Sequence, residues 1–112
     1  MVNKNYIPDR GDLVWMDFNP QLGKEQAGLR PALVLSGQTY NKIGLMVACP
    51  ITSKVKGYPF EVLVKAGKIT GAVLADHLRS LDWQSREIRF ICKAPKELQI
   101  KVFNTVLDIL MR

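Results

Sequence analysis

The sequence predicts a mainly β protein, a small and strongly curved sheet or barrel that is followed by a C-terminal helix. Two observations support this fold class. Short β-favouring segments alternate with turn residues as far as residue 92, and residues 95–112 carry apolar side chains at helical spacing. A length of 112 residues, 47% of them apolar, suits one domain (1–112) that buries its own core.

The predicted strands follow from composition. Segments with a strand's apolar or β-favouring content are residues 12–18, 32–36, 45–52, 60–64, 72–75 and 87–92. Between them we expect a surface loop over 21–28, a short helix or turn over 38–42, a basic loop over 54–58 and a turn region over 65–71. Residues 76–86 receive no assignment. Pro31 restricts Arg30 to an extended conformation, and Pro50 should confine its strand to a sheet edge or a bulge.

The chain should end in an amphipathic helix. Pro95 suits the first helical turn, and Glu97 favours the positive end of the helix dipole. The predicted buried face consists of Leu98, Val102, Phe103, Val106, Leu107 and Leu110. Ile100, Ile109 and Met111 widen the apolar surface beyond one stripe, which leaves some of it for a second subunit or another partner.

Composition limits the classes of function. No apolar run approaches the roughly 20 residues of a membrane span, and the N-terminus lacks a signal-peptide pattern, so we expect a cytoplasmic protein. Cys49 and Cys92 lie in apolar stretches and should be reduced core thiols. With His77 as the only histidine, a metal site is not expected, and no cofactor is expected either.

The charge distribution suggests a polyanionic partner. The net charge is +6, and residues 54–112 hold eleven Lys and Arg against six Asp and Glu. Lys54, Lys56, Lys65 and Lys68 face only Glu61 between residues 54 and 71. These lysines form either a rim that attracts phosphates or an ordinary solvated face.

The strongest local motif is Gly23-Lys-Glu-Gln-Ala-Gly-Leu-Arg-Pro31. It places a carboxylate, Glu25, and a guanidinium, Arg30, at the ends of one glycine-flanked loop. By itself the motif is only suggestive, because an exposed Glu and Arg usually form a weak surface ion pair.

A set of ordered motifs nevertheless resembles the MazF/PemK/Kid toxin family over nearly the whole chain. They are Gly11-Asp12, Asp17-Phe-Asn-Pro20, Gly23-Lys-Glu-Gln-Ala-Gly28, Arg30-Pro-Ala32, Val34-Leu-Ser36, Gly57-Tyr-Pro-Phe-Glu-Val62, Asp76 and Leu78-Arg-Ser-Leu-Asp82. The resemblance implies a small antiparallel SH3-like barrel, a homodimer, and a metal-independent ribonuclease that leaves 2′,3′-cyclic phosphate and 5′-hydroxyl ends. It also implies an acidic, partly disordered antitoxin partner.

RNA hydrolysis explains why these residue types are needed, because the 2′-hydroxyl is an internal nucleophile once a base removes its proton. Glu25 is the candidate base, and Arg30 is the candidate stabiliser of charge on the phosphoryl oxygens. Thr52 matches a family threonine of the phosphate site, although a strand-end threonine can instead satisfy local backbone. The acid that protonates the 5′-oxygen is left open between Arg30 and water.

Single-stranded RNA should bind between the loops 21–29 and 53–58, where unpaired bases can be read along their edges. The residues assigned to RNA binding are Lys24, Gln26, Lys54, Lys56, Tyr58 and Asp76. Tyr58 or Trp15 could stack on a base, and core packing is the alternative for both aromatic side chains. Asp76 also matches an aspartate proposed as an acid or base in some relatives, but those relatives have an arginine where this chain has Leu74, which argues against a catalytic role.

Two other functions share the predicted fold. One is gyrase poisoning of the CcdB type, and the other is RNA binding without cleavage. The Glu25 to Arg30 loop argues against the first, and so does the C-terminus, which ends Ile109-Leu-Met-Arg112 without the tryptophan associated with that poison.

Overall fold

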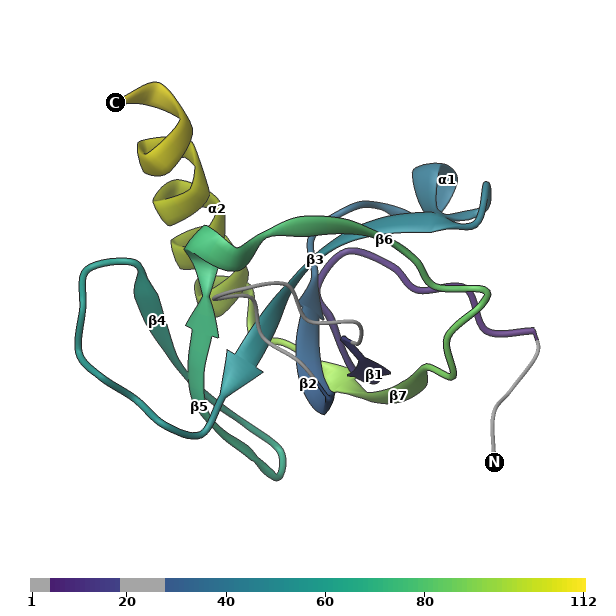
Figure 1. Cartoon of the computed structure of the whole chain (residues 1–112), viewed down its shortest axis with the longest axis horizontal. Coiled ribbons are helices and arrows are strands. Elements are labelled where there is room, and N and C mark those ends of the chain that lie inside the picture. The colour runs from purple at the N-terminus through teal and green to yellow at the C-terminus, as the bar shows by residue number, and fades with distance from the viewer. Residues whose placement is uncertain (1–4, 19–27) are drawn as a thin grey trace.

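The computed structural model describes residues 5–18 and 28–112. Within these residues the elements are β1 (Asp12–Asp17), β2 (Leu29–Val34), α1 (Gln38–Asn41), β3 (Leu45–Thr52), β4 (Glu61–Ala66), β5 (Ile69–Leu74), the 3₁₀ turn η1 (Ala75–His77), β6 (Arg79–Asp82), β7 (Arg89–Lys93) and α2 (Lys96–Met111). The strand pairs among these residues are antiparallel, and the sheet curls around itself with α2 on one side (Figure 1). This architecture confirms the predicted fold class.

Strand β3 is the centre of the sheet. The order of strands is β4-β5-β3-β2-β1-β7, and β6 pairs with β3 beside this path. The first half of β3 pairs with β6, from Leu45 opposite Asp82 to Ala48 opposite Arg79. Its last two residues, Ile51 and Thr52, pair with β5 instead. Because β3 changes neighbours along its length, the sheet divides into two diverging parts at the end of this strand.

The two faces of the sheet bury separate cores. Alternate residues of the strands point to opposite faces. One face packs Val14, Met16 and Phe18 of the first strand segment against Ala32, Val34, Met46, Ala48, Leu81 and Ile88 inside the curl. The other face packs Leu13, Leu33, Cys49 and Ile51 against Leu98, Val102 and Val106 of α2. The predicted strands 12–18 and 45–52 therefore each contribute to both cores.

The prolines lie where the ladder between β2 and β3 ends. The pairing of these strands runs from Val34 opposite Ala48 to Ala32 opposite Pro50. Pro50 was expected at a sheet edge or bulge, but it lies within the central strand. It is accommodated because the pairing of β3 with β6 stops at Ala48 and that with β5 starts at Ile51, so no ladder bond is required of a residue without an N–H.

Most strand boundaries differ from the sequence prediction, and the larger departures lie in three segments. Strand β2 begins at Leu29 rather than residue 32, because Leu29–Pro31 pair with β1 alone. The predicted turn region 65–71 contains the turn but is too wide, because β4 and β5 pair as far as Ala66 opposite Ile69. The positive φ of +56° at Gly67 permits the tight turn between them. The unassigned segment contains η1 and β6.

The terminal helix is confirmed, with two corrections. Pro95 immediately precedes the helix instead of lying in its first turn. Leu98, Val102 and Val106 are buried as predicted, but Leu107 and Leu110 are 53% and 71% exposed. The reason is that the C-terminal turns of α2 project beyond the sheet (Figure 1). The end of the helix thus presents uncovered apolar side chains.

The cysteines behave as expected of core thiols. Cys49 is buried, Cys92 is half-buried, and both are free. Burial raises the pKa of the Cys49 thiol to about 12, which disfavours the reactive thiolate. Among the helices in the described part of the chain, none is long and apolar enough to cross a membrane.

Candidate active site

Two of the three predicted catalytic residues end neighbouring strands on the same face. The antiparallel pairing of β2 with β3 places Ala32 opposite Pro50. Extending this register by two residues aligns Arg30 with Thr52, and alternation puts both on the face of Ala32 and Ala48. Arg30 also pairs with Met16 of β1, another residue of that face. Since the β2–β3 ladder has ended there, Arg30 and Thr52 stand on the two diverging parts of the sheet.

The local environment of Thr52 allows two roles. The residue is 6% exposed, and its Oγ1 accepts a hydrogen bond from the backbone N of Lys54 at 3.1 Å. This contact is the local role considered for a strand-end threonine. A hydroxyl group retains its own proton for donation, so the same contact orients Thr52 without excluding a bond to a phosphate oxygen.

Glu25, Lys24 and Gln26 lie outside the described residues. A hydrogen bond of 3.0 Å from the backbone N of Phe18 to the carbonyl oxygen of Gly28 joins the two described segments on either side of them. Gly28 has a φ of +82°, a conformation that a glycine adopts without strain. Gly28 thus directly precedes β2 and lies two residues before Arg30.

The basic loop after β3 is confirmed as a loop with exposed lysines. Lys54 and Lys56 are exposed, as are Lys65 and Lys68 on the β4–β5 hairpin. The loop is held by Glu61, the first residue of β4, whose carboxylate accepts hydrogen bonds from the backbone N atoms of Lys56 (3.1 Å) and Gly57 (2.7 Å). Glu61 thus fixes the backbone between the lysines and Tyr58.

Tyr58 and Asp76 form a hydrogen-bonded pair at the other end of this loop. The Tyr58 hydroxyl donates to Asp76 Oδ1 at 2.6 Å, and the Tyr58 and Phe60 rings meet edge to face. Partial burial and the bond to Asp76 raise the pKa of the Tyr58 hydroxyl above its ordinary value. His77 Nε2 lies 4.0 Å from Asp76 Oδ1.

This pair is separated from Arg30 and Thr52. Thr52 pairs with Ala72, whereas Asp76 lies in η1, beyond the far end of β5. Within one chain the structure therefore divides the predicted site into a strand-end group, which contains Arg30, Thr52 and Lys54, and a second group made of Tyr58 and Asp76.

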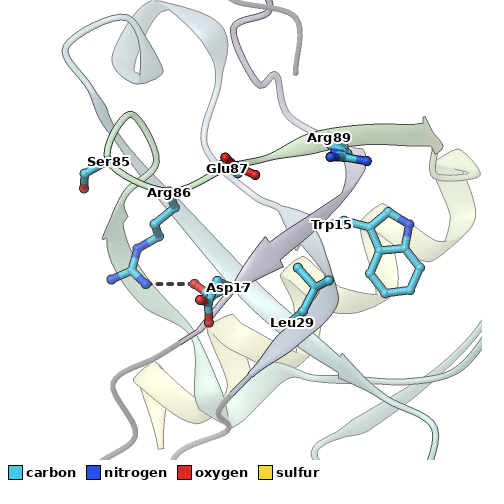
Figure 2. A pocket seen from close by; sticks show the side chains of 7 residues that line it. All are labelled: Trp15, Asp17, Leu29, Ser85, Arg86, Glu87 and Arg89. Atoms are coloured by element: carbon cyan, nitrogen blue, oxygen red, sulfur yellow. Dashed lines mark hydrogen bonds between the residues drawn. The ribbon is translucent and has the colours of Figure 1, made fainter. Parts of the chain in front are cut away.

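An open cleft was missed by sequence reasoning. It has a volume of about 880 Å³ and lies on the face opposite Arg30, where seven side chains line it: Trp15, Asp17, Leu29, Ser85, Arg86, Glu87 and Arg89 (Figure 2). Arg86 Nη1 donates to the carbonyl oxygen of Asp17 at 2.8 Å. Trp15 is 38% exposed, which excludes the core-packing alternative for this residue. Two of these lining residues, Ser85 and Arg86, belong to the segment 76–86, which received no assignment from the sequence.

The site offers no evident place for a metal. No group of three or more His, Cys, Asp or Glu side chains suited to hold one occurs among residues 5–18 and 28–112.

Comparison with known proteins identifies the family. The model of the PemK-like, MazF-like toxin of type II toxin-antitoxin systems matches residues 9–110. The chain belongs to this family. It is 47% identical over 97 residues to the endoribonuclease toxin MazF of Escherichia coli K12, covering 85% of this chain and 87% of that one.

Solved structures of the PemK/MazF family agree with this assignment. MazF of Deinococcus radiodurans superposes with a TM-score of 0.92 at 51% identity, covering 96% of this chain and all of that one. A MazE–MazF complex from the same organism gives a TM-score of 0.83 at 47% identity, with 95% and 97% covered. The family motifs read from the sequence and the fold thus lead to the same assignment.

Proposed function

We propose that this chain is a sequence-specific, metal-independent endoribonuclease toxin that cleaves single-stranded RNA and is neutralised by a cognate antitoxin. The observation that carries the proposal is the family match over residues 9–110, supported by 47% identity to a protein named as an endoribonuclease toxin. The alignment of Arg30 with Thr52 at the ends of β2 and β3 supplies the matching geometry.

In the proposed reaction the RNA provides the nucleophile. Glu25 removes the proton of the 2′-hydroxyl, the 2′-oxygen forms a bond to the adjacent phosphorus, and the bond from phosphorus to the 5′-oxygen breaks. The products are a 2′,3′-cyclic phosphate and a 5′-hydroxyl. Water is the favoured donor of the proton that the 5′-oxygen takes up, because a guanidinium keeps its protons.

Arg30 and Thr52 act on the charge that develops at phosphorus. A guanidinium stays charged and grips two oxygens with its planar fork. The Thr52 hydroxyl, oriented by the backbone N of Lys54, donates to a phosphate oxygen from the opposite part of the sheet. Donors placed on both sides stabilise the transition state more than the ground state, since the phosphoryl oxygens gain negative charge during attack.

The proposed assembly is a cytoplasmic homodimer that an acidic antitoxin covers. Leu107, Leu110 and Met111 at the end of α2 are exposed, and the last of these is 79% exposed. Apolar side chains gathered on one projecting element suit a second copy of the chain. The exposed lysines Lys54 and Lys56 suit an acidic segment that occupies the RNA path.

The decisive experiment is cleavage of a diverse labelled RNA pool by purified protein in excess EDTA. We expect RNA to be cut and DNA of the same sequences to remain intact. A cut-site ribose with hydrogen in place of the 2′-hydroxyl should stop cleavage at that site alone. Cleavage that continues there would refute the internal nucleophile, and an intact RNA pool would refute the proposed activity.

The same pool yields the recognition word. Sequencing the 5′-hydroxyl ends across many RNAs should show one short word at the cut positions. Ends without a common word would contradict sequence specificity while leaving the endonuclease activity in place.

A further inference from the structure

The cleft beside Trp15 has the composition of a nucleobase site. Trp15 and Leu29 are 38% and 67% exposed and lie next to each other on its floor (Figure 2). Trp15 pairs with Arg89 of β7 on one side and with Pro31 of β2 on the other. Its cross-strand neighbours are therefore a guanidinium and an apolar ring. Exposed aromatic faces beside arginine are the surfaces on which unpaired bases stack.

The rim of the cleft suits a base edge better than a phosphate. Among the described lining residues, Arg86 and Arg89 carry guanidinium donors and Asp17 and Glu87 carry carboxylate acceptors, so their formal charges cancel. Arg86 Nη1 already donates to the carbonyl oxygen of Asp17. A phosphate would meet as many negative as positive groups. A base presents donors and acceptors together on one edge, and arginine and carboxylate side chains are matched to such edges. The volume of about 880 Å³ is ample for one base.

The cleft lies near Arg30 in the chain but on the opposite face of the sheet. Asp17 and Leu29 are the last residue of β1 and the first of β2, and Leu29 directly precedes Arg30. Successive strand residues point to opposite faces, so the cleft and Arg30 lie on the two sides of the β1–β2 hairpin. An RNA strand that passes the last residue of β1 and the first residues of β2 reaches both. The base in the cleft therefore belongs to a nucleotide next to, but not within, the cleaved step.

We propose that this cleft binds one unpaired nucleobase of the substrate RNA, on a nucleotide flanking the scissile step, with Trp15 as the stacking platform and the polar rim reading the base edge. The inference rests on the proposed function and extends it, because it assigns part of the sequence specificity to the outer face of the sheet. An antitoxin side chain and a second copy of the chain are the competing occupants, and the experiments below separate them from RNA.

The two tryptophans allow a direct binding test. Trp83 is half-buried, and its indole N–H donates to the carbonyl oxygen of Asn41 at 2.8 Å, so it reports on the interior. Titration with a non-cleavable RNA, deoxy at the cut-site ribose, should change the fluorescence of Trp83→Phe, which keeps Trp15. The matched variant Trp15→Phe should show no comparable change. Equal responses of the two variants would overturn the assignment.

The position of the base is found by coupling a protein change to an RNA change. Single abasic sites are placed one at a time on either side of the cut word, and cleavage is measured for wild type and Trp15→Ala. At one flanking position we expect the abasic site to raise KM about 5-fold or more in wild type and to have no further effect in Trp15→Ala. Trp15→Phe, which retains a stacking ring, should recover part of the loss.

The outcomes separate the two proposals. A wild-type protein that cuts no RNA refutes the proposed function. If RNA is cut normally and each abasic site raises KM equally in wild type and Trp15→Ala, only the proposed base site in the cleft is refuted. Weakened self-association or weakened antitoxin binding in Trp15→Ala, with unchanged cleavage of every RNA, also refutes it and assigns the cleft to a protein partner. A far-ultraviolet unfolding curve confirms that each variant is folded.

Discussion

Removing the carboxylate of the buried residue Asp12 should destabilise the fold strongly. Asp12 is 4% exposed at the start of β1. Its Oδ2 accepts hydrogen bonds from the Tyr6 hydroxyl at 2.6 Å and from the backbone N of Asp9 at 3.0 Å. Its Oδ1 lies 2.7 Å from Lys93 Nζ. This one side chain therefore joins the N-terminal segment to β1 and to β7.

The magnitude follows from these three contacts. Hydrogen bonds to a charged acceptor contribute about 1.5–3 kcal/mol each, and we take the lower end because both are only partly buried. The ion pair adds about 0.5 kcal/mol, since the Lys93 side chain is 50% exposed. Asp12→Ala should thus lower the free energy of unfolding by about 3–4 kcal/mol.

Urea unfolding at neutral pH measures this change. With a urea dependence of about 1–3 kcal/mol per molar, the midpoint should fall by roughly 2 M. Lys93→Met is the matched control, because it removes the cation and leaves both hydrogen bonds to Asp12, and it should cost about 1 kcal/mol or less. A loss below about 1 kcal/mol in Asp12→Ala would show that the three contacts contribute little and that the reasoning is wrong.

Three further predictions concern catalysis and pH. Arg30→Ala and Glu25→Ala should each slow single-turnover RNA cleavage on the order of 100-fold or more. The control Lys42→Ala, which removes one exposed cation, should cleave at a rate near that of wild type. Near-normal rates in Arg30→Ala or Glu25→Ala would remove that residue from the mechanism. Thr52→Val should lower kcat while Thr52→Ser retains most of it, and equal rates in both would assign Thr52 to local structure alone. Burial and the hydrogen bond to Asp12 raise the pKa of the Tyr6 hydroxyl. As pH rises, the unfolded state therefore loses this proton first, and the free energy of unfolding should fall above about pH 10, by up to about 1.4 kcal/mol per pH unit. Tyr6→Phe should flatten this loss in alkaline unfolding curves.

The fold was predictable where a segment's pattern matched its local environment. The continuous apolar run of Leu45–Thr52 is the strand that contributes to both cores, and its bounds were predicted correctly. Strand β6 was not predicted, because its four residues alternate between partly exposed and buried and become a strand only by pairing with β3. Leu107 and Leu110 were placed on the buried face because helical spacing cannot show where the sheet beneath the helix ends.

The site was predictable only in its residue types. The family resemblance assigned Arg30 to phosphate chemistry, but its alignment with Thr52 follows from extending the register between β2 and β3, which the residue pattern does not show. The hydrogen bond between Tyr58 and Asp76 likewise depends on the pairing of β4 with β5. Trp15 could not have been recognised as exposed from alternation along β1, because it shares its face with Leu13, which is buried.

The prolines connect the sequence to the shape of the catalytic end. Pro31 and Pro50 have no N–H to donate, and the β2–β3 ladder stops at Ala32 opposite Pro50. Beyond that point β2 pairs only with β1, and β3 pairs only with β5. Arg30 and Thr52 are the next residues on the shared face, so they stand on either side of the opening instead of closing a ladder rung.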